Sequence, residues 1–280
     1  MSPLTAILLA ATLGAGAMSG SASGRWLAPV EVKGSIDGVK HQAPVLVYLP
    51  RGYSPDGLHK LLLALHGWAH APEDFREHTH LAALADARGL VVVLPAMGKT
   101  VYETRLYPET RGAWGPVPGA RWVAEVVLPW ARRTYAVSHE RSATGILGYS
   151  TGGRGAVVIA ERWPEFGFVA SLSGTYALEK LPATLGESKI HAAVFGDRAR
   201  FPERWRLDDA VRPDLKDSLA GVTVVLAHGG KDAVVPPGQM EEMRRFLEGT
   251  RAVLTVHLDP EAGHRWAFWD RAMEWALGRW

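Results

Sequence analysis

Short apolar runs alternate with helix-patterned segments along most of this chain, and no other feature constrains its fold as strongly. The apolar runs predict strands at Ala43–Leu49, Lys60–Leu65, Gly89–Leu94, Ala143–Leu147, Phe168–Leu172, Ile190–Phe195, Val222–Ala227 and Val253–Leu258. Helical spacing between them predicts helices at Glu73–Arg88, Trp122–Tyr135, Thr151–Trp163, Pro237–Glu248 and Trp266–Trp280. Several runs are apolar throughout, which is typical of parallel strands covered on both faces. The sequence therefore predicts one α/β domain over residues 24–280, with a mostly parallel central sheet flanked by helices on both faces.

Composition excludes several classes of function. The net charge is only +2, which gives no indication of nucleic acid or an anionic membrane as a partner. Cysteine is absent, so the chain has no disulfide framework, no thiolate zinc site and no cysteine nucleophile.

The N-terminus has the pattern of a secretory leader. Residues Leu4–Met18 are apolar and uncharged, and small residues follow at 19–24. The run is shorter than the roughly 20 apolar residues that a membrane span needs, so no stable membrane insertion is expected. We predict a cleavable signal peptide at residues 1–23 and a secreted or periplasmic protein. Because the first positive side chain is Arg25, an uncleaved anchor or a disordered tail stays open as an alternative.

A serine in a glycine-rich turn follows the strand that is predicted to end at Leu147. Gly148-Tyr149-Ser150-Thr151-Gly152 reads G-x-S-x-G between a strand and a helix, which is the context of a nucleophile elbow. Side chains at the two glycines would collide with the neighbouring strand and helix. The motif predicts Ser150 as a nucleophile, and the alternative is a serine that only caps the following helix.

A serine nucleophile needs a base and an acid that orients the base. Asp232 and His264 follow the last two predicted strands, in the chain order Ser–Asp–His that this kind of site uses. We therefore predict a triad of Ser150, Asp232 and His264. Asp197 is a weaker candidate for the acid, and its alternative role is to cap a turn.

The remaining histidines near these loops are expected to be structural. His228 precedes the acid and is expected to shape its loop, while His257 lies within a strand pattern.

Two backbone N–H groups are expected to stabilise the oxyanion. Thr151 opens the helix after the nucleophile, and Trp68 follows Gly67 in the loop after the strand Lys60–Leu65. His66 in the same loop is expected to brace it by a hydrogen bond.

Histidines and acids cluster after this loop and invite a metal interpretation. The cluster consists of His66, His70, His78 and His80 with Glu73, Asp74 and Glu77. No H-E-x-x-H spacing occurs, and His78 and His80 would point to different faces of a helix. A solvated helix start is the better interpretation, and we predict neither a metal nor a cofactor.

Beside these features the chain resembles the putative-esterase branch of the α/β-hydrolases, which includes esterase D, feruloyl esterases and the antigen 85 mycolyltransferases. The matching segments are Tyr48-Leu49-Pro50, Gly52-Tyr53, Leu65-His66-Gly67, Glu125–Tyr135, Gly196-Asp197, Trp205–Asp209 and Gly263–Trp266 leading to Trp269. The resemblance implies an α/β-hydrolase fold, the same triad roles for Ser150, Asp232 and His264, and oxyanion donors at Trp68 and Thr151.

The chain departs from this branch in two places. The segment Thr175–Ser188 is shorter than the helical insertion that many members carry, which suggests an open site. Asp209-Ala210 stands where members commonly have Asp-Pro.

We therefore predict a serine carboxylesterase that acts through an acyl-enzyme on a small acyl or aryl ester, including feruloyl-type and polysaccharide-linked esters. Aromatic residues that could line an aryl pocket, or equally pack in the core, are Trp68, Tyr102, Trp114, Trp266 and Trp269. The alternatives are acyl transfer to a sugar or lipid hydroxyl with the same triad, and a non-catalytic binding protein.

Overall fold

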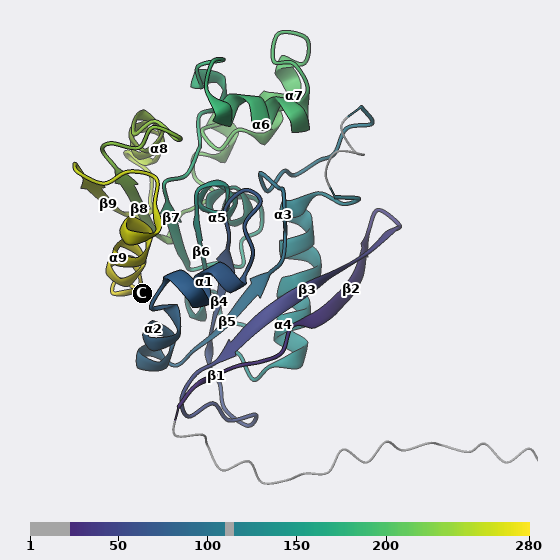
Figure 1. The fold of residues 1–280 in the computed structure, drawn as a ribbon, viewed down its shortest axis with the longest axis vertical. Coiled ribbons are helices and arrows are strands. Elements are labelled where there is room, and N and C mark those ends of the chain that lie inside the picture. The colour runs from purple at the N-terminus through teal and green to yellow at the C-terminus, as the bar shows by residue number, and fades with distance from the viewer. Residues whose placement is uncertain (1–22, 110–114) are drawn as a thin grey trace, which may run out of the picture.

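A computed structural model describes residues 23–109 and 115–280 of the chain (Figure 1). The predicted signal peptide and Trp114 lie outside these residues, apart from Ser23. None of the helices in the described ranges has the length and apolar character that crossing a membrane would require.

In the described part of the chain, nine strands form one sheet, in the order β1-β3-β5-β4-β6-β7-β8-β9 with β2 paired to β3. The strands are β1 (Arg25–Trp26), β2 (Val30–Ile36), β3 (Val39–Leu49), β4 (Lys60–Leu65), β5 (Leu90–Pro95), β6 (Thr144–Tyr149), β7 (Phe168–Leu172), β8 (Thr223–Gly229) and β9 (Val253–Asp259). The strands from β4 to β9 pair in parallel, and β1, β2 and β3 are joined antiparallel at one side. The predicted α/β architecture is confirmed, and the sequence missed β1 and β2.

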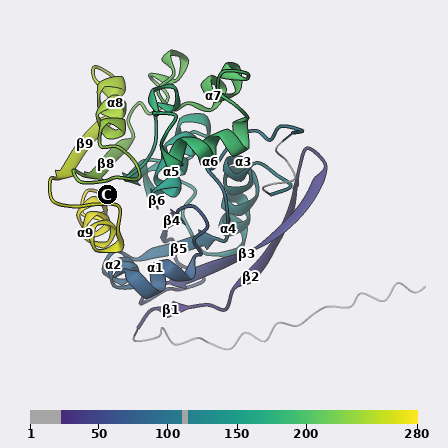
Figure 2. The same ribbon diagram turned by 45° about the horizontal axis from the view of Figure 1, so that its top comes forward.

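Helices cover both faces of this sheet (Figures 1 and 2). They are α1 (Glu73–His78), α2 (Leu81–Arg88), α3 (Gly119–Arg121), α4 (Leu128–Thr134), α5 (Thr151–Arg162), α6 (Gly186–Phe195), α7 (Pro202–Asp208), α8 (Gly238–Leu247) and α9 (Trp266–Leu277), with a π-helical turn at Trp122–Val127 between α3 and α4 and 3₁₀ turns at Arg141–Ala143, Leu178–Lys180 and Pro213–Leu215. Helices α4, α5 and α8 pack into the apolar cluster on one face. Helices α1, α2 and α9 pack into the cluster on the other face.

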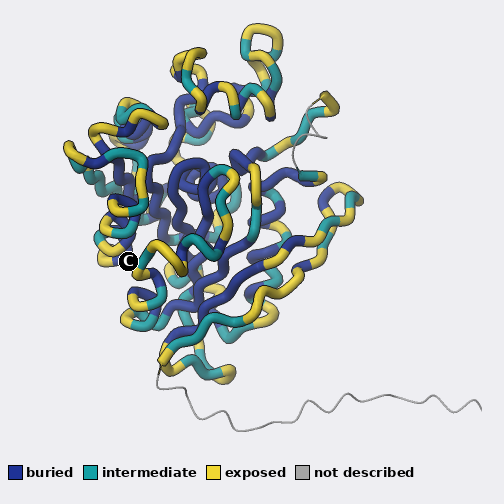
Figure 3. Tube along the Cα trace, viewed as in Figure 1, coloured by how far each residue is buried: buried dark blue, intermediate teal, exposed yellow. Residues whose placement is uncertain are grey.

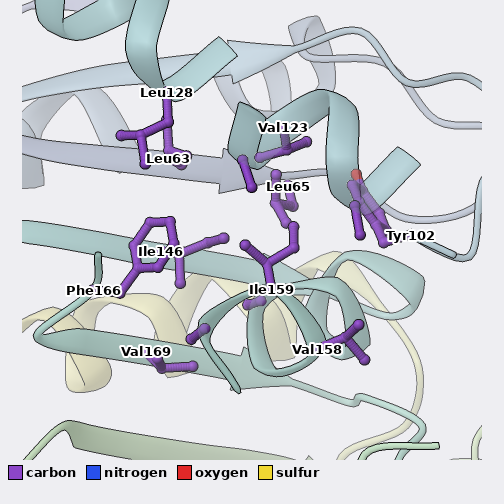
Figure 4. Close-up of a cluster of buried hydrophobic side chains, with 14 of the residues drawn as sticks. Leu63, Leu65, Tyr102, Val123, Leu128, Ile146, Val158, Ile159, Phe166 and Val169 are labelled. Carbon is purple, nitrogen blue, oxygen red and sulfur yellow. The ribbon is translucent and has the colours of Figure 1, made fainter. Parts of the chain in front are cut away.

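The central strands are buried along their whole length, which explains their continuous apolar sequences (Figure 3). On the α5 face, Leu63 of β4 lies beside Leu128 of α4, and Ile146 of β6 lies beside Ile159 of α5 (Figure 4). This packing fixes β6 and α5 relative to each other, and the turn that joins them is therefore held rigidly.

The predicted strand at Ile190–Phe195 is wrong, because these residues form the second half of α6. The helix buries Glu187, His191, Val194 and Phe195, a spacing of three and four residues that belongs to a helix. A six-residue run that is apolar except for His191 fits either element, and packing in the cap decides here for a helix.

Helices α6 and α7 belong to a longer insertion at residues 173–212, which we call the cap segment. Its apolar core includes Leu178, Leu181, Phe195 and Trp205. The expectation of a short segment is therefore also wrong, and the open site inferred from it stays a prediction. The N–H of Ala210 donates to the carbonyl of Tyr176 at 3.2 Å, so the two ends of the cap segment meet.

Two predicted helices differ in detail. The helix expected over Glu73–Arg88 is two helices, because Thr79 is extended (φ −137°, ψ 162°) and bonds the backbones on both sides through its hydroxyl. The helix expected over Trp122–Tyr135 begins with the π-helical turn Trp122–Val127, and Pro129 lies at the start of α4, which follows it.

Candidate active site

Ser150 lies on the turn between β6 and α5 with φ 57° and ψ −126°, a conformation that a serine rarely adopts. Its N–H donates to the carbonyl of Leu172 at 2.8 Å, which holds the turn against β7. The side chain makes no capping hydrogen bond to α5. The alternative interpretation of Ser150 as a helix cap is therefore excluded, and its hydroxyl is free to face another partner.

The glycines of the motif are required by close backbone contacts. A Cβ at Gly148 would lie 2.2 Å from the carbonyl oxygen of Gly152, and a Cβ at Gly152 would lie 2.1 Å from that of Leu65. Real Cβ atoms do not approach backbone this closely, so only glycine permits the turn to sit on the strand edge. The collisions expected from the sequence are confirmed.

The three predicted triad residues lie within hydrogen-bond distance of one another. The Nε2 atom of His264 is 2.9 Å from the Oγ of Ser150, and its Nδ1 is 2.7 Å from Oδ2 of Asp232. The three side chains come from separate loops that follow β6, β8 and β9. The carboxyl ends of parallel strands thus bring together residues far apart in the sequence.

The tautomer of His264 follows from its partners. An ionised carboxylate can only accept, so Nδ1 carries the hydrogen and Nε2 is left to accept the proton of the Ser150 hydroxyl. Burial opposes the charge on Asp232, but the hydrogen bond and charge of His264 outweigh it and hold the pKa of Asp232 below its ordinary value. The other carboxylate oxygen accepts the N–H groups of Val234 and Val235 at 3.0 and 2.8 Å. Asp232 is therefore ionised and fixed in position.

The loop after β4 runs directly beside the serine. A Cβ added at Gly67 would lie 3.2 Å from the Cβ of Ser150, and Gly67 and Trp68 line the same pocket as Ser150. His66 braces this loop as expected, since its ring bonds the carbonyl of Gly67 at 2.7 Å and accepts the N–H of Met97 at 2.8 Å. Thr151 is the first residue of α5, so its N–H lies at the helix start, where no preceding turn can accept it.

A pocket of about 440 Å³ opens over these residues. Its walls come from the sheet edge and from the cap segment, and its lining comprises Gly67, Trp68, His70, Tyr149, Ser150, Gly186, Glu187, Ile190, Ala233, Val234, His264 and Trp269. This volume is in the range of small-molecule sites, which span roughly 300–1,000 Å³.

Aromatic rings pack behind His264. Trp269 meets the His264 ring edge-on at 4.9 Å and donates its N–H to the hydroxyl of Ser173 at 3.2 Å. Tyr149 stacks on Trp269 at 4.5 Å and contacts Trp266 at 4.6 Å. Trp269 thus supports the His264 ring, and Tyr149 and Trp266 hold Trp269 in place.

The aromatic residues singled out in the sequence divide between the two roles left open for them. Trp68 and Trp269 line the pocket. Tyr102 is completely buried and bonds the carbonyl of His66 through its hydroxyl at 2.9 Å, so it belongs to the core. Trp266 packs against Tyr149 and is not among the residues that line the pocket.

The competing candidates take structural positions. Asp197 accepts the N–H of Arg200 at 3.0 Å at the surface of the cap segment, which is the turn role. His228 is buried and bonds the carbonyl of Val235 at 2.9 Å, and so shapes the Asp232 loop. His257 lies in β9 against Trp275, with ring centroids 4.8 Å apart.

One group in the described ranges has the composition of a cation site. Potential ligand atoms of Asp74, Glu77 and His78 lie within 4.8 Å of one another on and beside the surface of α1. His78 also stacks on Trp266 at 4.9 Å. Clusters of exposed acids are common on solvated helices, and this one lies outside the pocket.

Sequence reasoning missed the side chains that complete the pocket. Glu187 and Ile190 reach it from α6, and His70 reaches it from the loop after β4. Nothing in the local sequence marks Glu187 as a pocket residue, because its place depends on how the cap segment folds over the sheet. In the sequence, His70 is a candidate only as part of the cluster of histidines and acids that invites a metal interpretation.

Comparison with known proteins agrees with this geometry. Residues 37–279 match the model of a family described as "Putative esterase". A search of curated proteins finds no match.

Solved structures share the fold at low sequence identity. An S-formylglutathione hydrolase from Agrobacterium tumefaciens is 20% identical, with a TM-score of 0.73 over 93% of this chain and 97% of its own. A ferulic acid esterase is 19% identical, with a TM-score of 0.69 over 92% and 97%. MPT51 from Mycobacterium tuberculosis is 17% identical, with a TM-score of 0.66 over 90% and 97%. At these identities the likeness establishes the α/β-hydrolase fold.

Proposed function

Because this chain belongs to the "Putative esterase" family of α/β-hydrolases, we propose that it hydrolyses carboxylic esters with Ser150, His264 and Asp232 as its catalytic triad. The observation that carries the proposal is the unbroken chain of hydrogen bonds from Asp232 Oδ2 through the His264 ring to Ser150 Oγ, at 2.7 and 2.9 Å. No further residue is needed to activate the serine.

The steps follow from this arrangement. His264 takes the hydroxyl proton as Ser150 attacks the ester carbonyl, and Asp232 stabilises the imidazolium that forms. His264 then gives the proton to the leaving alcohol, and the acyl group stays on Ser150. Water, deprotonated by His264, attacks the acyl-enzyme and releases the acid.

The backbone N–H groups of Trp68 and Thr151 bind the oxyanion in both tetrahedral intermediates. They flank Ser150 from the loop after β4 and from the start of α5. The N-terminus of α5 adds a favourable dipole for negative charge. Each such donor is worth about 10²–10³ in kcat in a comparable site.

The substrate is a small acyl or aryl ester. The volume of about 440 Å³ and the rings of Trp68 and Trp269 in the pocket wall support an ester with a compact apolar or aromatic part, including feruloyl-type esters. A screen of acetyl, butyryl, longer acyl and feruloyl esters orders these substrates by kcat/KM.

The decisive test replaces the nucleophile. Ser150→Ala should lower kcat for p-nitrophenyl acetate by about 10⁴–10⁶, and it should abolish labelling by a fluorophosphonate probe. Ser142→Ala is the matched control, because Ser142 is exposed near the opposite end of β6. Full turnover by a folded Ser150→Ala protein would end the proposal.

A further inference from the structure

Glu187 is a buried acid in the wall of the pocket described above. Its residue is 3% exposed, and it lines the pocket together with Ser150 and His264. It lies in the first turn of α6, and its Oε1 accepts the hydroxyl of Thr175 at 2.7 Å. A carboxyl group in this position is costly unless something compensates its charge.

No lysine or arginine of the described residues forms an ion pair with Glu187, although the charges of His264 and Arg154 favour its ionised form from beyond contact distance. Among the ion pairs of the described residues, the only basic side chain near it is His191, whose Nδ1 is 3.6 Å from Oε1. That Nδ1 already bonds the carbonyl of Glu187 at 2.9 Å. Burial lowers the pKa of His191 to about 3, so His191 is neutral at pH 7. Burial in turn raises the pKa of Glu187, and the hydrogen bond from Thr175 and the charges of His264 and Arg154 only partly oppose this effect.

The rest of the pocket wall suits an organic cation. Aromatic rings of Trp68, Tyr149 and Trp269 line it with the aliphatic Ile190, and none of the lining residues is a lysine or an arginine. Aromatic faces attract ammonium groups most strongly where water is excluded. An anionic substrate would find no lysine or arginine in this wall to pair with.

We propose that this pocket selects esters that carry an alkylammonium group, with the Glu187 carboxylate as its charge partner. The proposal rests on the esterase function and narrows its substrate class. Binding of the cation favours the ionised form of Glu187, since an opposite charge at short range stabilises the carboxylate. The ammonium group can belong to the alcohol or to the acyl part of the ester, and the two arms of the test separate these cases.

The test compares each cation with its uncharged carbon isostere. The alcohol arm uses acetylcholine and its uncharged isostere neohexyl acetate. The acyl arm uses the p-nitrophenyl esters of γ-trimethylammoniobutyrate and of its tert-butyl isostere. Shape is the same within each pair, so a difference in kcat/KM reports the charge. We expect the wild-type protein to prefer the cation about tenfold in one arm, which corresponds to about 1.4 kcal/mol.

Glu187→Gln removes the charge but keeps an oxygen that can accept from Thr175. It should bring the ratio close to one, because it should raise KM for the cationic ester more than KM for its neutral isostere. Glu203→Gln is the matched control, because it removes a charge from an exposed side chain of α7 in the same cap segment. It should keep the wild-type ratio.

The outcomes separate this proposal from the esterase function. Absence of both p-nitrophenyl acetate turnover and fluorophosphonate labelling would refute the esterase. Turnover of p-nitrophenyl acetate without a preference for the cation in either arm would refute only the role of Glu187. An equal loss of both esters in Glu187→Gln would also refute it, since it would show that Glu187 only supports α6.

Inhibition of the wild-type protein gives a second measurement that needs no variant. Choline should inhibit p-nitrophenyl acetate turnover at least several-fold more strongly than neohexanol if the alcohol side carries the cation, and γ-trimethylammoniobutyramide should exceed its tert-butyl isostere if the acyl side does. Equal inhibition within both pairs would contradict the proposal.

Discussion

Gly67→Ala tests the oxyanion loop without altering any group that takes part in proton transfer. The new Cβ would lie 2.9 Å from Cε2 of Tyr149 and 3.2 Å from Cβ of Ser150. Carbon atoms in contact normally lie about 3.5–4.0 Å apart, so one side must move by about 0.5–1 Å. The backbone of Gly67 does not adopt a positive φ, so alanine adds no backbone strain of its own.

The loop has to move, because the ring of Tyr149 cannot. Tyr149 is fully buried, with ring centroids of Phe75, Trp266 and Trp269 at 5.2, 4.6 and 4.5 Å. A displacement of the donor next to Gly67 by up to about 1 Å should cost about 10²-fold in kcat. Overpacking should also lower the free energy of unfolding by about 1–3 kcal/mol.

The assay is kcat for p-nitrophenyl acetate, measured beside urea unfolding. Gly238→Ala is the control, because a Cβ at the first residue of α8 meets nothing within 4 Å. It should keep full activity and should not lose stability. If folded Gly67→Ala turned over at the wild-type rate, the Gly67–Trp68 segment would not supply an oxyanion donor.

Three more outcomes follow from the buried charges. Asp232→Asn should lower kcat by about 10⁴ with the fold retained, because an asparagine amide facing Nδ1 favours the wrong tautomer of His264; steady-state kinetics checks it. Burial lowers the pKa values of His66 and His191 from 6.5 to about 4 and about 3, so unfolded chains take up protons first. Each of these histidines should therefore lower the free energy of unfolding by about 2 kcal/mol at pH 5, while Asp209, whose pKa burial raises to about 6, should offset this by about 1 kcal/mol; a value unchanged in urea titrations between pH 7 and 5 would contradict this. Arg154→Met should cost about 3–5 kcal/mol in urea unfolding, because it leaves the buried carboxylate of Asp208 without its partner at 3.0 Å; a loss below 1 kcal/mol would show that this pair is dispensable.

The sequence predicted the catalytic layout well because each element of it has a local signature. The strands Lys60–Leu65 and Phe168–Leu172 are found with the predicted bounds. A short, continuous apolar run between turns is typical of a strand that helices cover on both faces. Ser150 is marked by its glycines, and Asp232 and His264 are marked by their places after strands. The positions of all three residues therefore follow from the order of strands and helices, which the alternating apolar and helical patterns of the sequence already predict.

The cap segment could not be predicted in the same way. Ile190–Phe195 has the composition of a strand, and only its packing over the sheet edge makes it a helix. The position of Glu187 in the pocket follows from that packing, so no local sequence pattern marks it. The reactive side chains are thus predictable from motifs that follow the strands, while the shape of the pocket depends on contacts between distant segments.

The meeting of Tyr176 with Ala210 has a practical consequence for redesign. Because the cap segment leaves and rejoins the body at neighbouring points, it can be exchanged as a cassette with little cost in loop closure. The incoming cassette has to bring a counterpart of Asp208 for Arg154, since that guanidinium stays behind in α5. A cap segment that recognises a different ester can then be introduced without changing Ser150, Asp232 or His264.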